Sequence, residues 1–268
     1  MTGSRSGDRH PTVPAELVGL AERLADTSGA IVRRYFRSGV AVIDKPDSSP
    51  VTIADREAEA EMRGLILSVY PDHGLIGEEH GTERADAEWV WVLDPIDGTK
   101  SFITGRPLFG TLIALCHRGS PVLGIIDHPA LGERWIGACG HPTRLNGKPV
   151  QVRPCADLHQ AALFASSPHQ FRGTAFEAFE RVRRRVRVVQ YGSDCYHYGL
   201  VASGFGDIAI EAGLGVHDYL ALVPVIEGAG GVITDWSGEP LAIGSGDRVV
   251  AAGDRRVHAE ALALLGST

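Results

Sequence analysis

Apolar residues recur at helical spacing in two segments near the N-terminus. The first segment opens at Pro14, and its apolar positions mostly recur every three or four residues as far as Tyr35, before Gly39. This period predicts a helix with one buried face. A second helix is predicted from about Asp55 to Pro71, because proline ends a helix. Its apolar face consists of Ala58, Met62, Leu65, Ile66 and Val69.

Short apolar runs rich in β-branched and aromatic residues follow these helices. Residues 89–93 predict the first clear strand, which ends in a turn sequence that opens at Asp94. The pair Asn146-Gly147 is typical of a tight hairpin turn. Together with three further runs it predicts an antiparallel meander. These runs are residues 111–115, 122–127 and 134–138.

The second half of the chain alternates between short strands and helices. The pattern predicts strands near 186–190 and 207–212, a helix after Asp218 and a closing helix over 255–265. No low-complexity linker separates the halves, so we expect them to share an extensive interface. The division that we predict is a loose arm over 1–13, an α+β half over 14–155 and an α/β half over 156–268.

Charge and composition exclude some classes of function. The chain has 26 Lys and Arg against 33 Asp and Glu, a net charge of −7, which disfavours nucleic acid as a partner. We interpret the basic run Arg181–Arg187 as a solvated helix end or subunit edge and assign it no function. The four cysteines lack the spacing of a zinc site and are interpreted as buried free thiols. No signal peptide or membrane segment is evident, so we expect a cytoplasmic protein.

Two aspartates stand three residues apart in the segment Asp94-Pro-Ile-Asp97-Gly98-Thr99. Pro95 restricts the backbone there and Gly98 frees it afterwards, so both carboxylates can face one point. Aspartates also occur in turns merely to hydrogen-bond their own backbone, and that alternative stays open for an isolated motif.

Two more acids are candidates for the same site. Glu78 follows the apolar pair Leu75-Ile76, where a predicted strand leaves the core, and Asp218 heads a predicted helix. Taken alone, Glu78 could be a solvated strand end and Asp218 a helix N-cap. Together with the aspartate pair, Glu78 and Asp218 form the pattern of one shared site.

Taken in order, these motifs resemble the inositol monophosphatase family, whose signatures are G-E-E, then D-P-[IL]-D-G-T, then [WH]-D before E-A-G-G. The resemblance spans nearly the whole chain and implies a layered αβαβα sandwich, commonly a homodimer. His217, where relatives often carry Trp, and the extra glycine after Glu227 depart from the pattern without removing an acid. The matching segments are Ser49–Asp55, Gly77-Glu78-Glu79, Asp94–Thr99, His217-Asp218 and Glu227–Gly231.

The resemblance also implies roles for these residues. Hard oxygen ligands suit Mg²⁺, and two or three such ions would neutralise the phosphate and activate a water for direct attack on phosphorus. Asp55 and Thr99, with Glu78, would prepare that water. The implied ligands are Glu78, Asp94, Asp97 and Asp218 with the Ile96 carbonyl.

Other phosphate chemistries need motifs that this chain lacks. A phosphatase with an aspartyl nucleophile has D-x-D-x-T, whereas two residues separate Asp94 from Asp97. None of the cysteines begins a Cys-x₅-Arg motif, and there is no nucleotide-binding G-x-x-x-x-G-K-[ST] loop. Metal-assisted hydrolysis of a small phosphorylated metabolite therefore remains.

The residues that would read the leaving group point to a nitrogen-bearing substrate. An acid at Asp194 disfavours a neutral polyol but would pair with an amine, and Tyr196 or Tyr198 could lie against an imidazole. This segment resembles the histidinol-phosphatase branch of the family. Glu211 matches the family's acid that binds a substrate hydroxyl, although it could also be a buried strand acid. The implied substrate contacts are Asp97, Gly98, Thr99, Ser193, Asp194, Tyr196, Glu211 and Asp218.

Two alternatives stay open at this point. The first is an inositol monophosphatase or a broad sugar-phosphate or 3′-phosphonucleotide phosphatase with the same metals. The second is a catalytically silent, metal-binding relative that acts through protein contacts. Core packing alone would also account for the two tyrosines.

Overall fold

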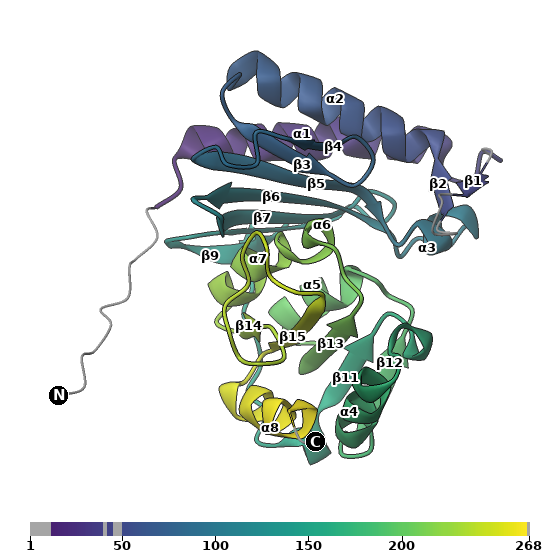
Figure 1. Cartoon of the computed structure of the whole chain (residues 1–268), viewed down its shortest axis with the longest axis vertical. Coiled ribbons are helices and arrows are strands. Elements are labelled where there is room, and N and C mark those ends of the chain that lie inside the picture. Colours follow the sequence, from purple (N-terminus) through teal and green to yellow (C-terminus); the bar gives the residue numbers. More distant parts are fainter. Residues whose placement is uncertain (1–11, 40–41, 45–49, 267–268) are drawn as a thin grey trace.

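The chain folds into five layers, which alternate helix, sheet, helix, sheet and helix (Figure 1). This computed structural model describes residues 12–39, 42–44 and 50–266. The αβαβα sandwich that the resemblance implies is therefore confirmed. Most of the predicted arm, residues 1–11, lies outside the described residues.

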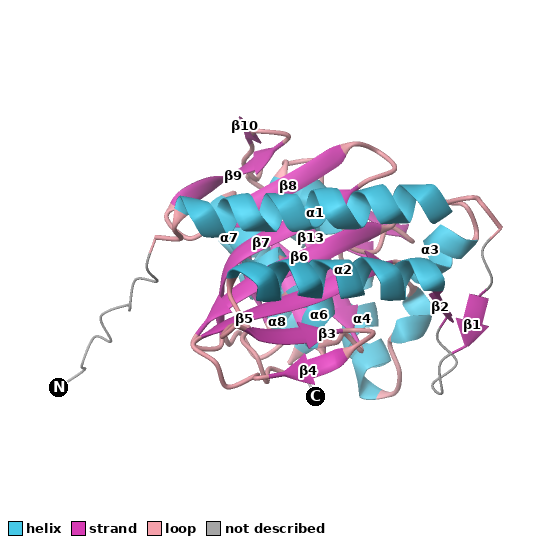
Figure 2. Cartoon of the chain, turned by 90° about the horizontal axis from the view of Figure 1, so that it is seen from above, coloured by secondary structure: helices cyan, strands magenta, loops and turns pink. Residues whose placement is uncertain are grey.

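The first two layers come from the N-terminal half. Helices α1 (Ala15–Tyr35) and α2 (Ile53–Val69) lie side by side on one face of an eight-stranded sheet (Figure 2). The sheet has the order β10-β9-β8-β7-β6-β5-β3-β4, and within it only β3 and β5 pair in parallel. A separate pair is formed by β1 (Val42–Asp44) and β2 (Pro50–Thr52). The strands are β3 (Gly74–Gly77), β4 (Gly81–Glu83), β5 (Trp89–Asp97), β6 (Gly110–His117), β7 (Ser120–His128), β8 (Glu133–Ala138), β9 (His141–Leu145) and β10 (Lys148–Pro149).

The predicted meander is confirmed, and three predicted ends need correction. Helix α1 ends at Tyr35, before the predicted stop at Gly39, because Phe36 leaves the helical conformation with a ψ of 125° and starts a turn. Helix α2 begins two residues before Asp55, since Thr52 caps it and Asp55 completes a capping box. Strand β5 continues through Asp97, where we expected a turn.

The last two layers come from the C-terminal half. A five-stranded sheet has the order β12-β11-β13-β15-β14, and β11 is parallel to both of its neighbours. Helices α4 (Thr174–Arg183) and α8 (Arg255–Leu265) cover its outer face (Figure 1). The strands are β11 (Ala162–Ala165), β12 (Val188–Tyr191), β13 (Ile208–Ala212), β14 (Val232–Thr234) and β15 (Arg248–Ala252).

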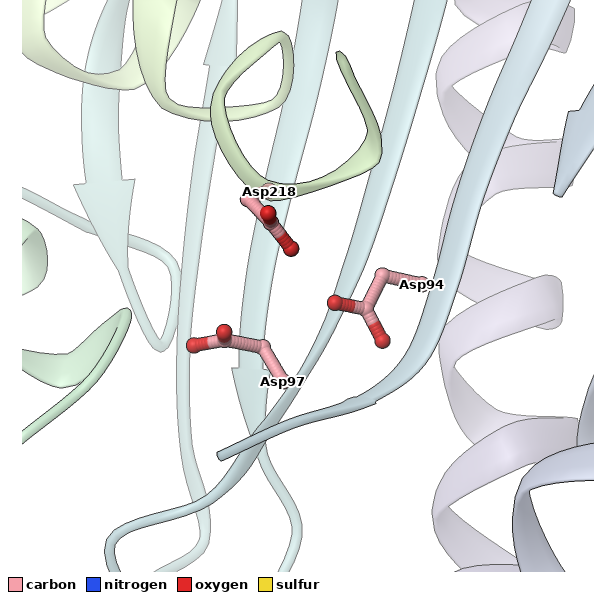
Figure 3. Close-up of side chains that lie close together, drawn as sticks. All are labelled: Asp94, Asp97 and Asp218. Atoms are coloured by element: carbon pink, nitrogen blue, oxygen red, sulfur yellow. The ribbon is translucent and has the colours of Figure 1, made fainter. Parts of the chain in front are cut away.

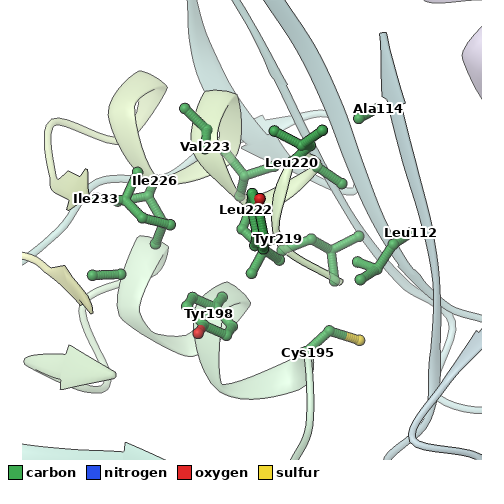
Figure 4. Close-up of a cluster of buried hydrophobic side chains, with 14 of the residues drawn as sticks. Leu112, Ala114, Cys195, Tyr198, Tyr219, Leu220, Leu222, Val223, Ile226 and Ile233 are labelled. Carbon is green, nitrogen blue, oxygen red and sulfur yellow. The ribbon is translucent and has the colours of Figure 1, made fainter. Parts of the chain in front are cut away.

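The middle layer joins the two halves. It contains α5 (Tyr196–Ala202), α6 (Val216–Tyr219) and α7 (Leu222–Gly228), which pack into one apolar core with the large sheet (Figure 4). The contact is close because two paired glycines, Gly124 of β7 and Gly137 of β8, face this layer. A Cβ on Gly124 would lie 1.9 Å from the carbonyl oxygen of Ala221, and a Cβ on Gly137 would lie 2.2 Å from that of Pro224. The expected extensive interface is therefore present, whereas the boundary near residue 155 stays a prediction.

The basic run lies at the C-terminal end of α4 and in the turn before β12. Arg181 donates a 2.8 Å hydrogen bond to the carbonyl of Leu264, and Arg183 pairs with Glu180. Cations are favourable at this end of a helix because its dipole is negative there. The described residues contain no helix that is both long and apolar enough to span a bilayer.

Candidate active site

Glu78 and Asp94 come together because two parallel strands end side by side. Gly77, the last residue of β3, pairs with Leu93 of β5, so the next residue of each chain segment is an acid at the same edge. The backbone N–H of Glu78 donates to the carbonyl of Leu93 at 3.2 Å. The buried carboxylate of Glu59, which the sequence did not suggest, then holds the turn by accepting from the N–H of Glu79 at 2.7 Å.

A β-bulge brings Asp94 and Asp97 to one side of the sheet. Residues three apart in a regular strand point to opposite faces. Here Asp94 pairs with Leu112 and Asp97 with Gly110, so β5 contains one extra residue over this interval. Because of this extra residue, the carboxylates of Asp94 and Asp97 lie on the same side of the sheet. Within the bulge, the buried carbonyl of Pro95 accepts a 2.8 Å hydrogen bond from the hydroxyl of Thr111.

Asp218 reaches the same place from the middle layer. It is the third residue of the short helix α6, and its carboxylate accepts from the N–H of Gly215 at 2.7 Å. The structure therefore places it inside the helix, where we expected it to head one. Ligand oxygens of Asp94, Asp97 and Asp218 all lie within 4.8 Å of one another (Figure 3).

The cluster is electrostatically suited to a divalent cation. Burial raises the pKa of Asp94 well above its ordinary value, and the charges of Glu78, Asp97 and Asp218 raise it further. Burial and the neighbouring Asp194 and Asp218 likewise raise the pKa of Asp97. Within the described residues no lysine or arginine forms a salt bridge with Asp94, Asp97 or Asp218. Closely placed carboxylates without a counter-ion, offering hard oxygen ligands, fit Mg²⁺.

Of the predicted water-activating residues, Thr99 follows Asp97 by two residues, and Asp55 lies in the first turn of α2, close enough to Glu79 to feel its charge. Burial, with a smaller contribution from Glu79, raises the pKa of Asp55 to about 6. The Asp55 carboxylate accepts from the hydroxyl of Thr52 at 2.6 Å, and the Thr99 hydroxyl donates to the Ile96 carbonyl at 3.1 Å. No hydrogen bond joins Asp55 to Thr99 in the described part of the chain. Their roles in the reaction stay predictions.

The loop before α5 closes over the bulge. The short helix α3 (Thr99–Ile103) follows Gly98, and Ser101 in its first turn donates to Asp194 at 3.0 Å. Burial raises the pKa of Asp194, while Ser101, Arg106 and Lys100 lower it. Cys195, which the sequence did not suggest, donates its backbone N–H to Asp97 at 2.6 Å.

Glu211 is buried in β13 among neutral donors. Its carboxylate accepts from the N–H of Ser166 at 2.6 Å, from the Ser166 hydroxyl at 2.9 Å and from the Gln170 amide. His197 Nε2 lies 3.3 Å from Glu211, and burial lowers the pKa of His197 to about 3, so that ring is neutral. Burial raises the pKa of Glu211 to about 8, and Asp194 adds to this effect. No sequence pattern indicated Ser166, Gln170 or His197.

The remaining predicted contacts belong to the same loop. The Tyr196 hydroxyl donates to Glu133 at 2.9 Å, and its ring meets those of His128 and Trp135 edge-on. The carbonyl of Ser193 accepts from the N–H of Tyr196. These contacts favour a packing role for Tyr196, and substrate binding by Tyr196 and Ser193 stays a prediction.

The layered α/β fold gathers three aspartates at one sheet edge, where their carboxylates could hold a metal ion. The sequence of residues 14–267 matches the model of the inositol monophosphatase family. The chain belongs to this family.

Individual relatives agree with this assignment. The chain is 54% identical to the bifunctional phosphatase IMPL2, chloroplastic, of Arabidopsis thaliana over 89% of the chain and 72% of that protein. It is 37% identical to a histidinol-phosphatase of Chlorobaculum parvum over 87% of the chain and 90% of that protein. An inositol monophosphatase structure from Zymomonas mobilis matches with a TM-score of 0.88 and 43% identity, covering 96% of this chain and all of that one.

Proposed function

We propose that this protein is a Mg²⁺-dependent phosphomonoesterase that hydrolyses L-histidinol phosphate to L-histidinol and phosphate. Glu78, Asp94, Asp97, Asp218 and the Ile96 carbonyl would hold two or three ions. When bound, Mg²⁺ supplies Lewis-acid chemistry, because it offsets negative charge on the phosphate and makes a water easier to deprotonate.

The chain's own residues would then orient the reactants and move the proton. Asp55 accepts the proton of the attacking water, with Thr99 as the intermediate hydroxyl. A base with a pKa of about 6 is well matched to this task, because it is ionised at neutral pH without being a weak proton acceptor. The N–H groups of Gly98 and Thr99 would hold phosphate oxygens at the start of α3.

The observation that carries the substrate assignment is the environment of Glu211. This buried carboxylate accepts three hydrogen bonds from neutral groups, and the neutral ring of His197 lies 3.3 Å away. In the described residues no lysine or arginine forms a salt bridge with Glu211, so its ionised form is costly and its pKa is raised to about 8. An ammonium or imidazolium group on the substrate would favour the ionised form by pairing with it.

Asp194 would contribute less to that cation than the sequence suggested. Ser101 already donates to it, and Lys100 and Arg106 lower its pKa, so part of its charge is compensated within the chain. We therefore assign the substrate cation mainly to Glu211 and give Asp194 a supporting electrostatic role. A neutral polyol would leave Glu211 without a positive partner, and the carboxyl group would stay mostly protonated at pH 7.

A substrate panel tests this proposal. Phosphate release with Mg²⁺ should show a kcat/KM for L-histidinol phosphate at least about 100-fold above that for inositol 1-phosphate or a 3′-phosphonucleotide. Comparable values would favour the second candidate, a broad inositol or sugar phosphatase, which the resemblance to the Zymomonas mobilis structure supports. Absence of release from every substrate would favour a silent relative.

A variant pair sharpens the assay. Glu211→Gln should lower kcat/KM for L-histidinol phosphate by about 10- to 100-fold, because the cation loses its charged partner. It should change the inositol phosphate rate less. Glu239→Gln, at an exposed position, is the matched control.

We further propose that the protein is a homodimer, as the resemblance implies, and that it acts in the cytoplasm. Light scattering on the purified protein would test the dimer, and an elution mass of one chain would refute it.

A further inference from the structure

Asp97 is tied to the loop before α5 by a hydrogen bond from the backbone of Cys195. The Cys195 N–H lies 2.6 Å from Oδ2 of Asp97 and links α5 to the bulge of β5. A ligand carboxylate needs such a partner, because one oxygen must be held while the other faces the metal. The position of Cys195 therefore decides where the Asp97 carboxylate points.

The side chain of Cys195 is itself held by a histidine. Its Sγ lies 3.6 Å from Nε2 of His128, and Nδ1 of His128 lies 2.7 Å from the carbonyl of Phe109. A carbonyl can only accept, so Nδ1 carries the ring proton and Nε2 is left as an acceptor. Burial lowers the pKa of His128 to about 4, which keeps the ring neutral. The Cys195 thiol can therefore donate to Nε2, and it also interacts with the Asp97 carboxylate, whose pKa it lowers.

The neighbouring strand β6 has a glycine, Gly110, where a larger residue would collide with this contact. Gly110, which pairs with Asp97 across β5 and β6, would with a Cβ come within 2.7 Å of the Cys195 sulfur and 2.9 Å of His128 Cε1. Figure 4 shows the sulfur pointing from the start of α5 toward the strand of Leu112. Both Cys195 and His128 are buried. The thiol and the imidazole are thus fitted against Gly110 of β6, the strand that pairs with the bulge of β5.

We propose that His128 and Cys195 are positioning residues for the metal site: the contact from thiol to imidazole fixes the start of α5, so that the Cys195 N–H holds Asp97 ready to bind Mg²⁺. Neither side chain needs to touch substrate. The chain of contacts runs from the Phe109 carbonyl through His128 and Cys195 to Asp97. The proposal rests on the metal role given to Asp97 in the proposed function, and it does not depend on the substrate.

The test is calorimetric titration of Mg²⁺ into the metal-free, full-length protein, without substrate. Cys195→Ala removes the donor. His128→Asn removes the Nε2 acceptor, while its amide can still donate to Phe109. Each substitution should raise the Kd for Mg²⁺ by about 3- to 10-fold. The double variant should bind Mg²⁺ no more weakly than Cys195→Ala alone, since Cys195→Ala already breaks the contact from thiol to imidazole.

Cys116→Ala is the matched control, because Cys116 is a buried cysteine of β6 that packs in the apolar core. Cys116→Ala should lose about as much stability as Cys195→Ala, and its Kd for Mg²⁺ should stay within about twofold of the wild-type value. The proposal is refuted if Cys195→Ala and His128→Asn match this control in Mg²⁺ affinity, or if their effects add. If the wild-type protein itself binds no Mg²⁺, the metal role of Asp97 in the proposed function fails as well.

Discussion

Gly98 and Asp194 are packed so closely that a side chain on one would displace the other. A Cβ built on Gly98 would lie 2.6 Å from Oδ2 of Asp194. Gly98 also has a φ of 82°, in the left-handed region that favours glycine. The segment that would bind phosphate and the loop that would read the leaving group are therefore fitted against each other at this point.

Gly98→Ala should lower kcat/KM by at least about 100-fold and destabilise the fold by about 1–3 kcal/mol, because it combines backbone strain with a clash. Activity assays and thermal unfolding would measure both effects. The double variant Gly98→Ala/Asp194→Ala should recover part of the stability, since the clash is relieved and the strain remains. Equal stability of the single and double variants would show that the contact is unimportant.

Asp97→Asn should abolish turnover and yet stabilise the metal-free protein at pH 8. The reason is that Asp194 and Asp218 repel the ionised carboxylate of Asp97. Wild-type protein should gain about 2.7 kcal/mol from Mg²⁺ at a hundred times its Kd, and the variant much less. Thermal unfolding with and without Mg²⁺ measures both, with the exposed Asp86→Asn as control. Near-normal turnover by Asp97→Asn would overturn the metal assignment.

The pH dependence of kcat should report Asp55. Burial raises its pKa to about 6, and a general base acts only when it is deprotonated. Activity at saturating Mg²⁺ should therefore rise with pH through about 6 and then level. Asp55→Asn should lose at least about 100-fold in kcat, and its residual rate should lack this rise. An unchanged profile in the variant would assign the base to another group.

Glu211 should make the folded protein less stable as pH rises. Its pKa is about 8 in the folded state and near 4.5 in an unfolded chain, so the folded state holds the proton more tightly. The stabilisation is complete below pH 4.5 and is lost as pH rises through about 8. Chemical denaturation between pH 5 and 9 should show this loss in the wild type and a shallower one in Glu211→Gln. Parallel curves for the two proteins would mean that Glu211 is already ionised at low pH.

The sequence alone determined the local structure and the identity of the acids. Helical spacing, the β-rich runs and Asn146-Gly147 predicted most elements, because local preferences and the buried face specify them. The motifs at Glu78, Asp94 and Asp218 identified the family, which the match over residues 14–267 confirms.

Only the tertiary structure decided how these acids meet and what surrounds them. The bulge between Asp94 and Asp97 depends on pairing with β6, so the sequence suggested a turn there. Cys195 and His128 are 67 positions apart, and they come into contact only when the start of α5 packs against the large sheet. Periodicity reports which side of an element is buried, whereas a site is made by elements that the chain brings together from far apart.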